Sequence, residues 1–541
     1  MLGSIQMPSK WLPRQSSNSV IQYQCLLCLT SGFISNLQQR VASVQWDVSV
    51  SHATLLTLGI GLCVGLLTTL LALWLSLATC WFRITGSKIA IALISSFLLI
   101  PLYVQATAWS AGFGSNGWLR LSQVDASKHP LMGLASVVWI HTCAATPYCF
   151  WILALGLRRT YNPLVDQSML ESGPVFTLRS QLLPKLKPWL IASFLWAFAS
   201  VHYDMVVTNL FQTPTLCESV YQQVQFGKLR SLPILIAWGI SIAVGLSLSL
   251  GSIFLRLRNT VRSQMAKDNT ANLVLSKYQR NLISLVTWLA LLVCFVIPWL
   301  NLISRLGVRS SIVDGQGVRT WSLAECSTAL WHVQDFADEF SWSLQLSLWA
   351  TAISLVLASM LLWTTRNRVG HVLAIGLLGC MLATPGPLIN LAIGQLLNRH
   401  LPDSLSFLSD RTLIGPILAL QFRILPVVFG LLWITRQQYL DRQGELLQLE
   451  NQLHAKSRIY SWVRYSQWGW ITTFWIGFCI AFGDLASYLL VQPPGVTTIA
   501  MRMFDLLHYG TKNREAGLAV ALALLGALSS LLWIRSLHRI R

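Results

Sequence analysis

The sequence predicts an all-α polytopic membrane protein, built as two parallel repeated helical bundles with about 11–12 transmembrane helices. Of the 541 residues, 54% are hydrophobic and only 11% are charged, and the mean hydropathy is +0.56. A soluble globular protein carries about 25% charged residues, so this composition excludes a large water-soluble fold. Apolar segments close to the ~20 residues that span a bilayer recur along the chain, and their order repeats.

These apolar segments are expected to be helices, because a backbone in hydrocarbon must satisfy its hydrogen bonds within its own segment. We predict eleven of them. They are residues 53–82, 89–113, 131–157, 189–212, 232–255, 282–304, 341–363, 370–396, 413–435, 468–491 and 515–535.

The distribution of Lys and Arg predicts the orientation. The net charge is +19, and one set of connecting segments is more than twice as rich in Lys and Arg as the other. Because positively charged loops stay in the cytoplasm, we expect a plasma (inner) membrane protein with its N-terminus outside and its C-terminus in the cytoplasm. We expect the lipid bilayer, and not nucleic acid, as the partner of this charge. The rich set comprises residues 83–88, 158–188, 256–281, 364–369, 436–467 and 535–541.

The apolar segments divide the chain into two halves of the same order and orientation. We predict an N-terminal tail at 1–52, on the outside, a first half at 53–255, a cytoplasmic linker at 256–281 and a second half at 282–541. The second half has an additional leading helix at 282–304. The first half is therefore one helix short, either because that helix was lost or because the true start lies upstream.

A long basic cytoplasmic loop occurs once in each half, at 158–188 and 436–467. In the first loop, an amphipathic helix at 166–171 is expected to meet Gly173, which suits a turn with positive φ. Pro184 suits the restart of a helix. A cytoplasmic motor needs such a helix–turn–helix in order to push on a membrane protein. A merely solvated basic loop is the alternative that the spacing leaves open.

The first loop resembles the coupling loop of type I ABC importer permeases. The consensus of that loop is Glu-Ala-Ala, three residues, Gly and, about a dozen residues later, Pro. Gln167, Ser168 and Met169 stand at the Glu-Ala-Ala position, and Gly173 and Pro184 follow. The resemblance implies that these residues couple the chain to an ATPase.

The second loop matches the same consensus less well. Glu450, Asn451 and Gln452 stand at the Glu-Ala-Ala position, Ala455 or Lys456 replaces the Gly, and no Leu-Pro follows. Both loops depart from the consensus, so the resemblance indicates where an ATPase docks but leaves the strength of the coupling open.

The closing segments carry a more specific resemblance. Phe482 to Gly510 resembles the end of the fused, double-length permeases of the iron(III) and thiamine importer group. In that group an acidic residue, a Pro-Pro-Gly-x-x-Thr turn and a Leu-x-x-Tyr-Gly-like ending recur. His202 to Gly227 is a weaker copy in the first half, and fragments at Arg423–Pro426 and Trp109–Leu119 also match. The resemblance covers the chain apart from its N-terminal tail.

The resemblance implies the permease subunit of an ABC importer, which is not itself an enzyme. The sequence contains no G-x-x-x-x-G-K-[ST] phosphate loop, so we expect ATP hydrolysis on a separate ABC ATPase subunit, present in two copies. A periplasmic or extracellular substrate-binding protein is the other implied partner. A small solute would cross by alternating access, with ferric iron among the candidates. We expect no catalytic residues, no cofactor and no metal site.

Two other classes are alternatives. A secondary active transporter with two parallel repeats also uses eleven to twelve helices, but a charged motif is expected in its short cytoplasmic turns. The turns at 83–88 and 364–369 contain no carboxylate. A membrane-embedded enzyme would need a carboxylate or His cluster at one membrane face, and the acidic residues of the loop at 305–340 do not have the spacing of a metal site.

Ionisable residues inside the apolar segments are the candidates for a translocation pathway, because burying charge in a bilayer is costly. Asp204 and Asp484 occupy equivalent places in the two halves, where each either lines the pathway or caps a helix. Arg423 either faces the pathway or locks two helices together. Asn390 follows a Pro-Gly-Pro sequence where a helix is expected to break near the cavity. His141 is expected to be an interior histidine, with no carboxylate at ligand spacing.

Overall fold

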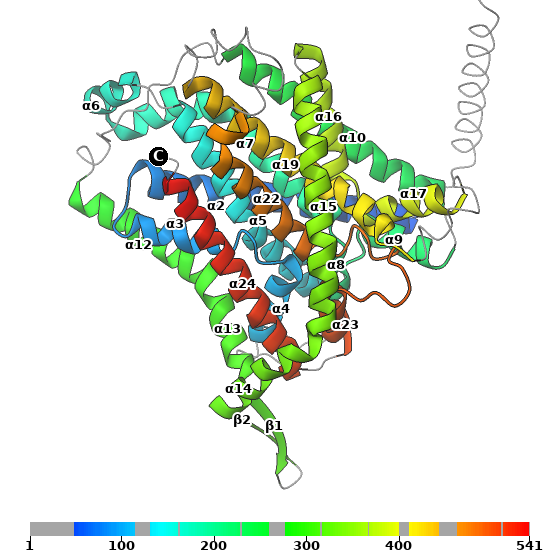
Figure 1. The fold of residues 1–541 in the computed structure, drawn as a ribbon. Helices are drawn as coiled ribbons and strands as arrows, with labels where there is room; N and C mark the ends of the chain where they lie inside the picture. The colour runs from blue at the N-terminus through cyan, green and yellow to red at the C-terminus, as the bar shows by residue number, and fades with distance from the viewer. Residues whose placement is uncertain are drawn as a thin grey trace, which may run out of the picture.

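Helices make up almost all of the described chain (Figure 1). The exception within the described ranges is a hairpin of two antiparallel strands, β1 (Val308–Val313) and β2 (Gln316–Trp321), in which Val308 pairs with Trp321. The computed structural model describes residues 48–113, 130–160, 163–227, 230–258, 276–313, 316–365, 367–399, 411–442, 462–509 and 512–539.

Six helices in these ranges are long and apolar enough to cross a membrane. A bent pair, α16 (Arg368–Ala383) and α17 (Gly386–Arg399), is a seventh if it counts as one span. The described chain is therefore an all-α polytopic membrane protein. The six are α2 (Val48–Ser76) with η1 (Leu77–Trp81), α5 (Pro130–Thr160), α10 (Ser231–Arg258), α12 (Lys277–Leu291) with η3 (Leu292–Val296) and α13 (Ile297–Leu306), α14 (Leu323–Trp331) with η4 (His332–Phe336) and α15 (Ala337–Thr364), and α19 (Ile414–Arg442).

Two of the predicted spans are broken by proline. The segment predicted at 89–113 forms α3 (Ser87–Ser96) and α4 (Leu102–Phe113), which starts directly after Pro101. The segment predicted at 370–396 is the pair α16 and α17, which bends by 103° at its Pro-Gly-Pro sequence. Proline lacks an N–H and is favoured where a helix starts, so it ends one helix and begins the next.

Two other helices end earlier than predicted. The expected ends are at 212 and 491, but α7 (Leu183–Tyr203) and α22 (Gln467–Gly483) each stop before an aspartate. The backbone of Asp204 and Asp484 is extended, with ψ of 137° and 141°. An Asp side chain can bond to nearby backbone N–H groups in competition with the helix. The two aspartates consequently take up matching places at the ends of two helices.

The long helices pack as two groups of three. In the first group α2, α5 and α7 contact one another, and in the second α15, α19 and α22 do so. The last helix of each predicted half crosses to the other half, so that α10 lies along α16 and α24 (Lys512–Arg539) lies along α3 (Figure 1). Glycine permits the first of these approaches, since a Cβ on Gly379 of α16 would lie 3.1 Å from the Cα of Gly245 of α10. The exchange interlocks the two halves.

A matched hydrogen bond occurs in both groups. The Oγ1 of Thr57 on α2 accepts a hydrogen bond of 2.8 Å from the N–H of Leu216, which starts α9 (Leu216–Gln225). The Oγ of Ser343 on α15 accepts one of 2.8 Å from the N–H of Ile499, which starts α23 (Ile499–Tyr509). The first N–H groups of a helix have no partner within it. In each group, a hydroxyl of the first long helix supplies one.

α6 (Pro163–Thr177) and the last turns of α24 lie toward one end of the molecule in Figure 1, and the β1–β2 hairpin lies at the opposite end. α6 belongs to the loop at 158–188. The loop at 158–188 and the C-terminal segment are both predicted to be cytoplasmic, and the described parts of the two lie toward the same end of the fold.

Candidate functional site

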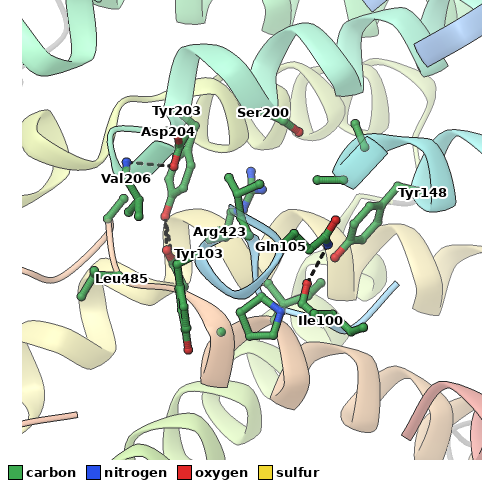
Figure 2. Close-up of a pocket in the computed structure, with 18 of the residues that line it drawn as sticks. Ile100, Tyr103, Gln105, Tyr148, Ser200, Tyr203, Asp204, Val206, Arg423 and Leu485 are labelled. Atoms are coloured by element: carbon green, nitrogen blue, oxygen red, sulfur yellow. Dashed lines mark hydrogen bonds between the residues drawn. The ribbon is translucent and has the colours of Figure 1, made fainter. Parts of the chain in front are cut away.

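A cavity of about 120 Å³, lined by apolar side chains and by several polar and charged ones, lies between the two helix groups. The break between α3 and α4, together with α5 and α7, lines one side, and α19, α22 and the residues after α22 line the other. Three of the four residues predicted for a pathway line this cavity, namely Asp204, Asp484 and Arg423. Figure 2 shows Arg423 drawn between Tyr203 and Tyr148.

Asp204 belongs to the first side of the cavity and receives hydrogen bonds from its own half. The side chain is buried, and its oxygens accept from the backbone N–H groups of Val206 (3.1 Å) and Val207 (3.0 Å) at the start of α8 (Val206–Leu210). The Nε2 of His141 on α5 lies 3.3 Å from Asp204 Oδ2, which is an ion-pair distance without the alignment of a hydrogen bond. His141 is interior, as predicted, but it does face a carboxylate.

Asp484 is held from the other half. The hydroxyl of Tyr203, the last residue of α7, donates to the Asp484 carboxylate and lies 2.6 Å from each oxygen. The hydroxyl of Ser487 also donates to this carboxylate. The place that corresponds to Tyr203 before Asp484 is occupied by Gly483, where a Cβ would lie 3.0 Å from the Cγ of Pro101. Only the first half therefore supplies an aromatic hydroxyl at this position.

Arg423 projects from α19 onto aromatic rings of α7. Its guanidinium carbon lies 4.4 Å from the ring centroid of Tyr203 and 5.9 Å from that of Trp196, so each ring is within range of a cation–π contact. Within the described ranges, its guanidinium makes no hydrogen bond and has no carboxylate at ion-pair distance. The cation thus links the two helix groups through ring faces.

Two further polar side chains line the cavity from the segment around α4. Tyr103 is only 1% exposed, and its hydroxyl has no hydrogen-bond partner in the part of the chain that the structure describes. The Nε2 of Gln105 donates to the carbonyl of Ile100 at 3.0 Å and so holds the turn before α4 (Figure 2).

Asn390 lies beside the cavity but does not line it. Its Nδ2 donates to the carbonyls of Gly386 (2.8 Å) and Ala486 (3.0 Å), and its Oδ1 accepts from the N–H of Leu490 at 3.3 Å. Asn390 therefore fastens α17 to the segment after α22. The contact with a solute that its place in the sequence suggested remains a prediction.

The first predicted coupling loop forms a bent helix. Gly173 interrupts α6 with φ of 80° and ψ of 168°, a conformation open mainly to glycine. Before the bend, Gln167 donates to Glu171 at 2.8 Å and Ser168 lies 3.1 Å from Thr177 Oγ1. Pro184 stands at the start of α7, after the π-helical η2 (Leu178–Leu182).

α6 has one buried and one exposed apolar face. Met169 is buried in a cluster with Trp81 of η1 and Leu157 of α5. Leu170, Val175 and Phe176, here called the α6 tip, are 62%, 78% and 56% exposed. The helix is therefore anchored to the membrane-spanning helices on one side and leaves apolar side chains uncovered on the other. The predicted coupling residues of the second loop, Glu450, Asn451 and Ala455, lie outside the described residues.

Sequence reasoning missed the contacts that join the two sides of the cavity. Tyr203 directly precedes Asp204, yet it bonds to Asp484, and His141 meets Asp204 from another helix. No local spacing signals either contact. The one sequence feature that marks these positions is an aspartate directly after the helix in both halves, preceded by Tyr203 in the first half and by Gly483 in the second.

No cluster of three or more His, Cys, Asp or Glu side chains that would suit a metal ion occurs in the described ranges. Comparison with family models, with curated proteins and with solved structures finds no match to this chain.

Proposed function

We propose that this chain is the membrane-spanning permease subunit of an ATP-driven ABC importer, and that a small solute passes through its central cavity by alternating access. The observation that carries this proposal is the cavity between two packed helix groups, which three charged side chains line. Asp204, Asp484 and Arg423 are costly to place at membrane depth. Such groups are retained where they contact a solute or where they shift the equilibrium between two conformations of the protein.

Three relationships support an interpretation of the halves as parallel repeats. Asp204 and Asp484 end equivalent helices, and Thr57 and Ser343 make equivalent hydrogen bonds. The crossing of α10 onto α16 has its counterpart in the crossing of α24 onto α3. Two bundles related in this way can rock about a shared cavity, which is the motion that alternating access requires.

The α6 tip supports an ATPase as the source of energy. Exposed Leu170, Val175 and Phe176 form an apolar surface that a partner protein can cover. Buried Met169 connects the same helix to the ends of α2 and α5. A push on the tip would therefore move the first helix group, and we assign the ATPase contact to this surface.

A pull-down from gently solubilised membranes tests the proposal. We expect the tagged full-length chain to recover an ABC-type ATPase, and Phe176→Glu to reduce that recovery, because it places a charge on the apolar tip. Leu323→Glu is the matched control, since Leu323 is 75% exposed but belongs to α14, next to the hairpin. A co-purifying solute-binding protein would identify the solute class, ferric iron included.

Two results would contradict the permease proposal. If no ATPase is recovered while a known importer prepared in parallel keeps its own, the permease assignment is wrong. Solute uptake that follows an ion gradient and does not need ATP would instead indicate a secondary active transporter.

A further inference from the structure

The charged groups of the cavity differ in how far this chain satisfies them. Asp204 already accepts two backbone N–H donors and faces His141, and Asp484 already accepts the hydroxyls of Tyr203 and Ser487. Arg423 carries five N–H donors and, within the described ranges, none of them has an acceptor. Of these three charged groups, Arg423 is therefore the one whose hydrogen-bonding capacity is left open.

The buried hydroxyl of Tyr103 is a second and independent observation. It lines the same cavity, is almost fully buried and lacks a partner among the described residues. A buried hydroxyl without a hydrogen bond is unfavourable, so a ligand that brings an oxygen acceptor would satisfy it. Arg423 and Tyr103 come from two different helices that line the cavity, α19 and α4.

The aromatic lining does not favour a cation. Rings of Tyr203 and Trp196 would attract a cationic ligand, but the guanidinium of Arg423 already lies over both. A second cation would meet this positive charge at close range. An anion meets this charge as a partner, and the two carboxylates that line the same cavity already have donors of their own.

We infer that the cavity binds the anionic, oxygen-rich group of a small solute, a carboxylate or another small oxyanion, on Arg423 with Tyr103 as a further donor. The volume of about 120 Å³ suits a group of a few heavy atoms. This inference rests on the proposed solute pathway, for which it names the substrate class. The anionic group is either a whole inorganic oxyanion or the charged end of an organic acid.

Ligand-dependent thermal unfolding of the full-length chain in nanodiscs tests it. The probes are sodium sulfate, sodium phosphate, sodium acetate and sodium hexanoate, with tetramethylammonium chloride as the cation, all at constant ionic strength. Sulfate and phosphate represent whole oxyanions, and the two carboxylates represent the charged end of an acid. Because kosmotropic anions stabilise folded proteins in general, the readout is the difference between the wild type and Arg423→Gln.

We expect at least one anion to bind the wild type, and Arg423→Gln to weaken that binding about tenfold or more, as for loss of a charged hydrogen bond. Arg411→Gln is the matched control, because Arg411 is exposed and does not line the cavity. Tyr103→Phe removes only the hydroxyl and is expected to weaken the same anion. If Arg423→Gln does not fold, Tyr103→Phe and Arg423→Lys carry the test.

Equal Tm shifts in the wild type and in the cavity variants with every anion would overturn the inference, as would a larger shift with tetramethylammonium. The assay contains no ATP and no ATPase, so its outcome is separable from the pull-down. Anion binding without ATPase recovery refutes the permease proposal alone. ATPase recovery without anion selectivity refutes this inference alone.

Discussion

The hydroxyl of Tyr203 donates a hydrogen bond to the carboxylate of Asp484, so the end of α7 in one helix group is tied to the end of α22 in the other. Tyr203 also presents its ring to Arg423 of α19. One side chain therefore joins the two sides of the cavity through both its polar and its apolar part.

Tyr203→Phe is expected to destabilise the fold while keeping the ring beneath Arg423. A hydrogen bond to a charged group contributes about 1.5–3 kcal/mol, so the free energy of unfolding should fall by about that amount. Tyr488→Phe is the matched control, because its hydroxyl pairs with the neutral Thr498 Oγ1 at 2.9 Å and should cost about 1 kcal/mol. Thermal unfolding in nanodiscs measures both. A Tyr203→Phe effect no larger than that of the control would contradict the role of this bond.

Thr57→Ala and Ser343→Ala are expected to have equal effects. Each removes the acceptor for the first N–H of a helix, and a lost hydrogen bond of this kind costs about 1 kcal/mol. The sites lie in different helix groups, so the double variant should be additive. Thr54→Ala is the control, since its hydroxyl only donates to Val50 of its own helix. A cost confined to one of the two sites would show that the groups are not matched there.

Gly173→Ala is expected to disturb α6 without creating a clash. No atom lies within 4 Å of a Cβ built there, so the cost comes from the backbone at φ of +80°, about 1–3 kcal/mol. Amide hydrogen exchange should become faster in α6 and stay unchanged in α2. Gly59→Ala is the control, because it also has open space but lies inside a helix. Unchanged exchange in α6 would show that the bend does not depend on glycine.

The loss of two different ion pairs is expected to lower the stability of the fold by different amounts. Arg305→Gln leaves the Glu515 carboxylate, which is 2% exposed, without its cation, and loss of one partner of a buried pair costs about 3–5 kcal/mol. Arg502→Gln breaks a pair in which Arg502 is 41% and Glu339 10% exposed, so water can reach this pair from the Arg502 side and we expect a smaller cost. The Tm should therefore fall more for Arg305→Gln. A larger fall for Arg502→Gln would contradict this ranking.

The correspondence between Asp204 and Asp484 could be predicted from the sequence, because each lies in an apolar segment at the same place in the order of segments. The sequence also located the bend at Gly173, since few residues other than glycine adopt its φ and ψ. It did not locate the ends of α7 and α22. Apolar residues continue past both aspartates, and the extended backbone at each Asp cannot be deduced from hydropathy.

The sequence by itself determined that this is a helical membrane protein. The fractions of apolar and charged residues and the lengths of the apolar segments can be read from the sequence without knowing how the helices pack. It also determined which residues are charged in an apolar setting. Tertiary structure alone decided their partners, His141 for Asp204, Tyr203 for Asp484 and the rings of α7 for Arg423. These partners come from different helices, and helix packing, not spacing along the chain, brings them to one cavity.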